Sequence, residues 1–239
     1  MPDLTHRRPR RVGHKGADHI TPGNTPASFD AALAHGVDMI EFDVLSENLD
    51  GTGELYLAHD YDALRAGAAP TLEEGLAHLA SETFADVELD VDLKLQGYEL
   101  RVLDALREHG LLDRVLVSTM EVPSLELLRE TEPALRLGWS VPRLRRDPMA
   151  TWWKRPAALA WGLTYRTALP RYAAKAISDG RVDALMANWR LVTPALVRHI
   201  HAAGGELYAW TVDDAAAIAR LEAMGVDGVI SNDPRLFGP

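Results

Sequence analysis

Short apolar segments alternate with longer amphipathic segments along almost the whole chain. The apolar segments are rich in Val, Ile and Leu, which is typical of strands buried in a parallel sheet. We expect eight such strands, at residues 11–14, 38–44, 87–93, 114–118, 135–140, 182–187, 206–210 and 228–231. Helical patterns separate them, so the order predicts an α/β fold, a TIM (β/α)8 barrel formed by residues 1–239 as one domain. An open doubly wound sheet is the alternative, and it is disfavoured because no glycine-rich dinucleotide-binding loop follows the first strand.

Capping residues and helix breakers mark several helix boundaries. Asn24, Thr25 and Pro26 indicate the start of a helix over 28–35, which Gly36 ends. A capping box at residues 71–74 predicts a helix to about residue 80. Further helices are expected at 100–109, at 123–130, from Thr193 to near Gly204, and from a cap at Asp213 or Asp214 to Gly225. An extended piece at 54–59 is expected as an excursion after the second strand.

Residues 143–181 differ in composition from the rest of the chain. They carry nine Lys or Arg and two Asp, and also Trp152, Trp153 and other aromatic residues. Asp147-Pro148 and Pro170 are interpreted as helix starts, and Pro156 is expected to break or kink the run. One hypothesis is a basic, aromatic lid that makes peripheral contact with an anionic membrane. The favoured interpretation is an outer helical layer with a basic face, because the barrel requires a helix there.

Composition and charge exclude several classes of protein. The 239 residues have a formal net charge of -10, which argues against a nucleic-acid partner. There is no cysteine, so disulfides and thiolate metal sites are excluded. No run of 18 apolar residues is present and the N-terminal residues do not resemble a signal peptide, so a cytoplasmic protein is expected. The sequence leaves the oligomeric state open.

Polar and aromatic side chains lie at or just past the carboxyl ends of the predicted strands. In a (β/α)8 barrel, this is the end where active sites form. The residues are His14, Glu41, Asp43, Asp92, Lys94, Ser118, Asn188 and Trp210. Two of them, Glu41 and Asp43, are two residues apart on one strand, so they point the same way and could hold a hard cation. His14 and His59, the latter on the excursion, form a possible acid–base pair. Two histidines together with two carboxylates suit the cleavage of an anionic phosphate ester.

The third predicted strand has one charged face. Glu88, Asp90, Asp92 and Lys94 alternate with apolar residues that should pack on the outer helices, so the charged face is expected inside the barrel. Buried like charges are costly unless a cation neutralises them. A metal site shared with the neighbouring strand is favoured over internal salt bridges to Lys94 or arginines.

In several motifs the chain resembles the glycerophosphodiester phosphodiesterase family. The similar segments follow the family's order and span nearly the whole chain. They are His14-Lys15-Gly16, Pro22-Gly23-Asn24-Thr25, Ile40-Glu41-Phe42-Asp43-Val44, His59-Asp60, Asp92-Leu93-Lys94, Trp210-Thr211-Val212-Asp213, and the closing segment from Asp227 to Pro234. This chain departs from the family pattern with Lys15 for arginine, Gly23 for glutamate, Asp92 for glutamate and Asp213 for asparagine. The segment between His59 and Thr71 is also shorter than in many members of the family.

The resemblance implies roles for these residues. His14 and His59 would be the acid–base pair, and Glu41, Asp43 and Asp92 would bind a divalent cation, Mg²⁺ or Ca²⁺. The implied reaction on a small phosphodiester begins with attack by the substrate's own glycerol 2-hydroxyl, and water then opens the cyclic phosphate. We further expect contacts with substrate from Lys15, Lys94, Trp210, Asn188 and Ser118. Lysophospholipase-D-like cleavage of a lipid and a barrel that binds phosphate esters without turnover are the alternatives.

Overall fold

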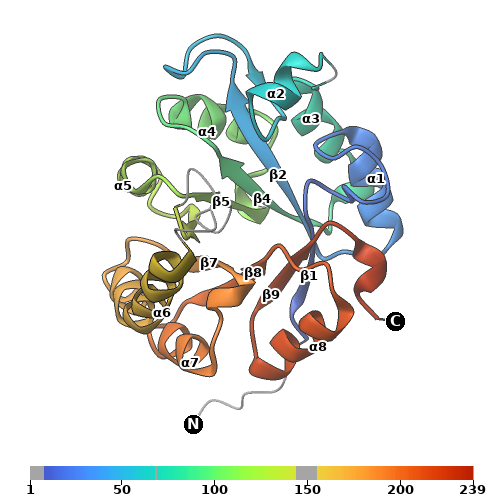
Figure 1. The fold of residues 1–239 in the computed structure, drawn as a ribbon. Helices are drawn as coiled ribbons and strands as arrows, with labels where there is room; N and C mark the ends of the chain where they lie inside the picture. The colour runs from blue at the N-terminus through green and yellow to red at the C-terminus, as the bar shows by residue number, and fades with distance from the viewer. Residues whose placement is uncertain (1–7, 68, 144–154, 239) are drawn as a thin grey trace.

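Eight parallel strands close into a barrel surrounded by helices (Figure 1). The computed structural model describes residues 8–67, 69–143 and 155–238, with the backbone alone for 155–163. The barrel strands are β1 (Arg10–Gly13), β2 (Met39–Ser46), β4 (Glu88–Leu93), β5 (Val115–Thr119), β6 (Arg136–Val141), β7 (Ala184–Asn188), β8 (Glu206–Trp210) and β9 (Gly228–Ser231). The first strand, β1, pairs in parallel with both β2 and β9, and this double pairing closes the sheet. The predicted TIM barrel is therefore confirmed.

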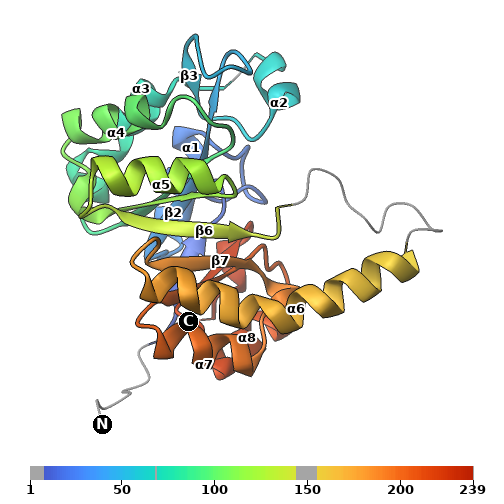
Figure 2. The same cartoon turned by 90° about the vertical axis from the view of Figure 1, so that its left-hand side faces the viewer.

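Helices cover the outside of the barrel (Figures 1 and 2). They are α1 (Pro26–Ala34), α3 (Leu72–Leu79), α4 (Glu99–Glu108), α5 (Val122–Thr131), α6 (Arg155–Ser178), α7 (Pro194–Ala202) and α8 (Ala215–Met224). The expected caps form at Thr25 and Thr71, where each side chain accepts a hydrogen bond from the third residue of its helix. Of the two candidate caps for α8, Asp214 is the one used.

Apolar side chains form two layers of core. The larger layer lies between the strands and the helices, with Phe29, Phe42 and Leu185 among its fully buried members. The smaller layer fills the inside of the barrel and consists of Val12, Met39, Leu116, Ala184, Met186, Tyr208 and Ile230, with Trp210 packed against it. The inner layer therefore closes the barrel below its open end, and the polar residues at the strand ends lie above it.

Two arginines and two glutamates form a ring of ion pairs inside the barrel at the amino ends of the strands. Arg10 contacts Glu88 and Glu206 at 2.9 and 3.0 Å, and Arg136 contacts the same two carboxylates at 2.7 and 2.8 Å. The four residues come from β1, β4, β6 and β8. The Tyr208 hydroxyl also donates to Glu206 at 3.0 Å. Each charge of the ring thus meets two opposite charges, so Glu88 takes the salt-bridge alternative rather than a metal site.

An excursion follows β2 before the chain returns to the barrel. Strand β3 (Leu55–Tyr56) pairs antiparallel with the end of β2, and the short helix α2 (Tyr61–Arg65) follows it. The sequence indicates the extended piece but not α2, which begins with Asp60 accepting hydrogen bonds from two backbone N–H groups. His59 stands immediately before this cap, so the excursion determines where its imidazole lies.

The basic segment contributes one long helix. The second half of α6 packs on the barrel through Leu169, Ala173 and Ile177, and the amino-terminal half projects beyond the strands (Figure 2). One expectation is wrong here, because Pro170 lies inside α6 rather than at a helix start. Pro156 is the second described residue of α6, so its expected effect on the run before the helix is not tested. Asp147-Pro148, Trp152 and Trp153 lie outside the described residues. Within the described part of the chain, no helix has the length and apolar character needed to span a membrane.

Candidate active site

A cavity of about 150 Å³ opens at the carboxyl ends of the strands. Seven of the residues expected at the site line it: His14, Glu41, His59, Asp92, Lys94, Ser118 and Trp210. Met120, Met186 and Ile230 form its apolar part. Polar and charged groups from β2 and β4 therefore share the cavity with apolar side chains from β7, β9 and the end of β5.

Four carboxylates form two rows on neighbouring strands. The register of β2 and β4 aligns Glu41 with Asp90 and Asp43 with Asp92. One oxygen from each of Glu41, Asp43 and Asp92 lies within 4.8 Å of the other two. The charged face of β4 therefore points into the barrel, as expected, and three carboxylates converge on one point.

The ammonium of Lys94 lies between two of these carboxylates and forms ion pairs with both Asp43 and Asp92. Burial by itself would favour the protonated form of Asp43, but the charge of Lys94 outweighs it and holds the pKa of Asp43 well below its usual range. Internal salt bridging and a convergent acidic cluster are thus both present. The position occupied by the ammonium is one that stabilises a positive charge.

Asn24 holds Asp43 from behind. Its Nδ2 donates to Asp43 Oδ2 at 2.8 Å, and its Oδ1 accepts the Asp43 backbone N–H at 3.0 Å. Asn24 is 5 % exposed and adopts a left-handed backbone with φ of +57°, a conformation that asparagine tolerates better than most residues. The sequence marks Asn24 as part of a helix start and of a motif that resembles the family, but its contact with Asp43 is found in the structure alone.

Glu41 is linked to the segment that follows β1. Its Oε2 accepts the Lys15 backbone N–H at 2.8 Å, and the left-handed conformation of Lys15, with φ of +50°, aims that N–H at the carboxylate. Burial raises the pKa of Glu41 well above its usual value, and the neighbouring charge of Asp43 adds to the effect. The Lys15 ammonium pairs with Asp18 at 3.0 Å, and Lys15 is not among the residues that line the cavity.

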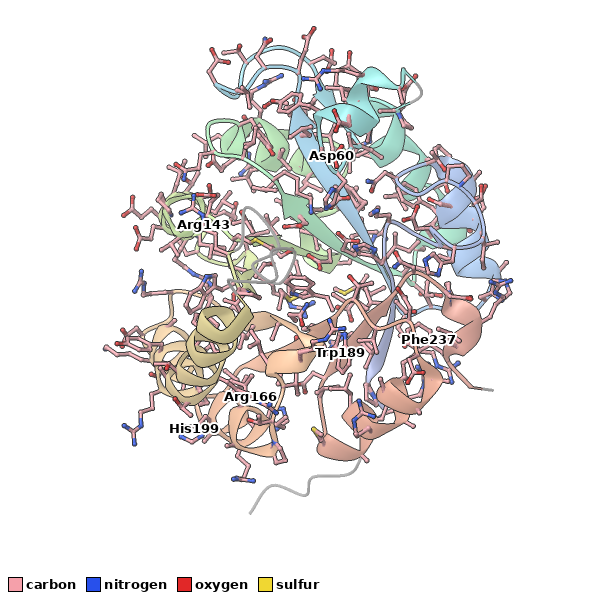
Figure 3. All side chains as sticks on the ribbon, in the orientation of Figure 1. Asp60, Arg143, Arg166, Trp189, His199 and Phe237 are labelled. Atoms are coloured by element: carbon pink, nitrogen blue, oxygen red, sulfur yellow. The ribbon has the colours of Figure 1, made fainter. Side chains whose placement is uncertain are left out.

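His14 is held between the barrel and the loop after β9. Its Nδ1 lies 2.5 Å from Asn232 Oδ1, and its Nε2 faces Glu41 Oε2 at 3.8 Å. Burial lowers the pKa of His14, which favours the neutral imidazole. His59 enters from the excursion, with its side chain 52 % exposed and its Nδ1 3.2 Å from Asp60 Oδ2. Asp60 is labelled at the start of α2 in Figure 3.

Asp90 lines the cavity although it was not among the expected site residues. It is 1 % exposed, and its Oδ1 has no hydrogen-bond partner among the residues that the structure describes. Burial raises its pKa to about 8, with a further contribution from the charge of Asp92, while a hydrogen bond from Ser118 acts in the opposite direction. The alternation along β4 indicates that Asp90 points inward, but its depth of burial is a result of the fold.

The remaining expected residues differ in position. The Trp210 ring lies at the cavity wall, with its Nε1 donating to the Met186 carbonyl at 2.8 Å. Asn188 accepts the Arg190 backbone N–H at 3.1 Å and caps a 3₁₀ turn. It is not among the lining residues. Arg166 and His199, labelled in Figure 3, lie on α6 and α7, across the barrel from Asp60.

The fold and this cavity define a (β/α)8 barrel with an acidic, histidine-containing site at its open end. The model of the Glycerophosphoryl diester phosphodiesterase family matches residues 14–51 and 64–236. The chain therefore belongs to this family.

Curated relatives agree with this assignment, and solved structures share the fold. The chain is 31% identical to a probable glycerophosphodiester phosphodiesterase 2 of Mycobacterium tuberculosis, over 96% of this chain and 89% of that protein. It is 25% identical to a glycerophosphodiester phosphodiesterase of Caldanaerobacter subterraneus subsp. tengcongensis, over 93% of each chain. A crystal structure from Agrobacterium tumefaciens, described as a putative glycerophosphoryl diester phosphodiesterase, has the same fold, with a TM-score of 0.74, 18% identity and 96% of each chain covered.

A phosphodiesterase of Oleispira antarctica was solved in complex with the product sn-glycerol-3-phosphate. It shares the fold with a TM-score of 0.68 and 21% identity, over 95% of this chain and 94% of that chain.

Proposed function

We propose that this protein hydrolyses glycerophosphodiesters to glycerol 3-phosphate and an alcohol, with a divalent cation at Glu41, Asp43 and Asp92 and with His14 and His59 as the acid–base pair. The observation that carries the proposal is that two histidines and an acidic cluster from separate elements meet at one cavity. Membership of the family supports the substrate class.

The acidic cluster fits a hard divalent cation. Three buried or half-buried carboxylates offer oxygen ligands within 4.8 Å of one another, and oxygen is the donor that Mg²⁺ and Ca²⁺ prefer. Lys94 already neutralises Asp43 and Asp92, which supports a positive charge at this point. When bound, the cation would polarise a phosphoryl oxygen and offset the repulsion between the carboxylates and an anionic diester.

The two histidines have environments suited to opposite proton transfers. His14 is enclosed and neutral, so its free ring nitrogen can accept the proton of the attacking glycerol 2-hydroxyl. His59 is half exposed at the open end, so it can donate a proton to the alkoxide as the alcohol leaves toward solvent. A water molecule then opens the cyclic phosphate with the two proton transfers reversed.

Product analysis tests the proposal. The purified chain is incubated with glycerophosphocholine or with lysophosphatidylcholine, in Mg²⁺, in Ca²⁺ or in EDTA. We expect glycerol 3-phosphate from the first substrate with metal and none in EDTA. Preference for the lysophospholipid would favour the lipid phosphodiesterase, and binding of glycerol 3-phosphate without turnover of either substrate would favour a binding barrel. Either result would overturn the proposed reaction.

A further inference from the structure

A chain of hydrogen bonds runs from the molecular surface to the ring of His14. Asp213, in the loop after β8, is exposed, and its Oδ2 accepts Asn232 Nδ2 at 2.7 Å. Its Oδ1 accepts the Asn232 backbone N–H at 2.8 Å and the Ser231 hydroxyl at 3.1 Å. The Oδ1 of Asn232 in turn lies 2.5 Å from Nδ1 of His14.

The carboxylate determines which way the Asn232 amide faces. An ionised carboxylate accepts hydrogen bonds and donates none, so only the NH₂ group of Asn232 can face Asp213. The amide oxygen must then face His14. Because that oxygen can only accept, the proton of a neutral His14 must reside on Nδ1.

The same geometry leaves the other ring nitrogen free. With the proton on Nδ1, Nε2 carries a lone pair, and Nε2 is the nitrogen that faces Glu41 and the cavity. A neutral imidazole with its lone pair toward the cavity is a proton acceptor. The alternative tautomer would point an N–H at the cavity and would be unable to accept a proton there.

We propose that Asp213 is a positioning residue that acts through Asn232 to fix the tautomer and the ring orientation of His14. The proposal rests on the role of His14 in the proposed function. Asp213 is separate from the helix cap, because Asp214 supplies the cap of α8. Asp213 therefore controls the chemistry of His14 although its carboxylate lies two hydrogen bonds away.

Replacing Asp213 by asparagine tests whether the carboxylate sets the direction of the hydrogen bonds from Asp213 through Asn232 to His14. Asn232 presents two donors to Asp213, its backbone N–H and its Nδ2, and a carboxylate accepts both. An amide offers one acceptor and one donor, so Asp213→Asn leaves one donor of Asn232 opposed by an N–H and frees its amide to turn over. We expect kcat to fall by at least about 10-fold with KM nearly unchanged, because part of the population holds the wrong tautomer.

Exchanging the residues at positions 213 and 232 should restore the direction of the hydrogen bonds to His14. In Asp213→Asn/Asn232→Asp, the new carboxylate accepts from His14 Nδ1–H and from the side-chain NH₂ at position 213, and the amide oxygen at 213 accepts the backbone N–H of residue 232. Asn232→Asp alone would place two carboxylates face to face. We therefore expect the double variant to exceed both single variants in kcat.

The direct readout is the ring ¹⁵N spectrum of His14 without substrate, assigned with His14→Ala. Wild type and the double variant should show the proton on Nδ1, and Asp213→Asn should show a population with the proton on Nε2. Asp86→Asn is the charge-matched control, since Asp86 is exposed before β4 at the opposite end of the barrel, and it should change neither spectrum nor rate.

Two results would overturn the inference. One is an unchanged spectrum in Asp213→Asn, and the other is a double variant that shows no recovery of the Nδ1–H form. The spectrum is independent of turnover, so a failure of the proposed function can be distinguished from a failure of this inference. In that case His14→Ala would keep full activity while the tautomer still followed Asp213.

Discussion

The two histidines at the cavity are chemically alike but held in different ways. His14 is enclosed and oriented by Asn232, whereas His59 is half exposed beside Asp60 on the excursion. The position of the His14 side chain is determined by contacts between β1 and the loop after β9. The position of the His59 side chain is determined by the local cap of α2. A mutation at either residue should therefore affect proton transfer rather than the fold.

Substitution of either histidine gives the first prediction. His14→Ala and His59→Ala should each lower kcat by roughly 10²–10⁴ at saturating metal, because each removes a proton-transfer partner. Thermal melts should stay close to wild type. Steady-state kinetics measure the effect, and His35→Ala, an exposed histidine after α1, is the matched control. Near-wild-type turnover in His14→Ala or His59→Ala would remove that residue from the pair.

Asp90 gives a second prediction, about stability and pH in metal-free protein. Its pKa is about 8 in the folded state against an ordinary value of 3.8. The unfolded chain therefore loses this proton at lower pH than the folded chain does. The contribution to stability is complete below pH ~4 and is lost as pH rises toward 8, by at most about 1.4 kcal/mol per pH unit.

Urea unfolding in EDTA, at pH values from about 4 to 8, measures how steeply the free energy of unfolding falls as pH rises. Asp90→Asn should flatten the curve, because the amide does not titrate, and Asp86→Asn, at an exposed site, should leave it unchanged. An equal slope in wild type and Asp90→Asn would show that another group is responsible.

The candidate site was predictable from the sequence where a motif carried it. His14, Glu41, Asp43, His59 and Asp92 stand at strand ends or in short motifs, and the structure brings them together. The roles of their supporting residues were not predictable. Asn24, Asn232 and Asp213 lie in the motifs that resemble the family, but they act through contacts with residues distant in sequence, and no local pattern indicates those contacts.

At the scale of elements, the carboxyl ends of β2 and β4 are joined by one tyrosine. The Tyr98 hydroxyl donates to the Val44 carbonyl at 2.6 Å and accepts the backbone N–H groups of Lys94 and Leu95 at 3.0 and 3.1 Å. It is 1 % exposed. This oxygen adds to the direct bond from the Lys94 N–H to the Val44 carbonyl in holding the segment that carries Asp92 and Lys94 against the strand that carries Asp43.

Removal of this hydroxyl is the third prediction. Tyr98→Phe leaves the Leu95 backbone N–H without its partner, at a cost on the order of 1–3 kcal/mol if water does not reach it. The Lys94 N–H and the Val44 carbonyl keep their bond to each other at 3.2 Å. We expect a lower midpoint of urea unfolding and a several-fold weaker binding of Ca²⁺, measured by calorimetry. Tyr56→Phe in β3 is the control. Unchanged Ca²⁺ affinity would separate the tyrosine from the acidic cluster.

The pattern along the chain predicted the barrel strands well, because buried parallel strands are short, apolar and separated by helices of clear period. It failed at α2, which is only five residues long and begins at a local cap, and at Pro170. A proline inside a helix costs one hydrogen bond, and the tertiary packing of Leu169 and Ala173 on the barrel outweighs that cost. Such tertiary effects are not visible in local sequence.

At the scale of the whole molecule, charge is placed at both ends of the barrel for different purposes. At the carboxyl ends the carboxylates outnumber the cations, whereas the ring of Arg10, Glu88, Arg136 and Glu206 at the amino ends is balanced. The inner apolar layer separates the two. Stability and chemistry should therefore respond to different substitutions.

The ring supplies the fourth prediction. Arg136→Met leaves Glu88 and Glu206 each with one fewer cation and should destabilise the fold by about 1–3 kcal/mol, because the lost bonds are charge-assisted and partly buried while Arg10 still pairs with both carboxylates. The kcat of the fraction that stays folded should be unchanged. Arg181→Met, which removes an exposed pair with Glu126, should cost less than about 1 kcal/mol. Chemical denaturation measures both, and equal losses would contradict a special role for the ring.

The closure of the barrel has a consequence for the order in which the protein matures during synthesis. The proposed metal ligands and both histidines emerge early from the ribosome, yet β1 pairs with β9, and Asn232 follows that strand. A nascent chain that still lacks β9 carries every reactive side chain but has no partner to orient His14. Catalytic activity should therefore appear in one step, when β9 docks against β1, rather than increase gradually as the polypeptide lengthens.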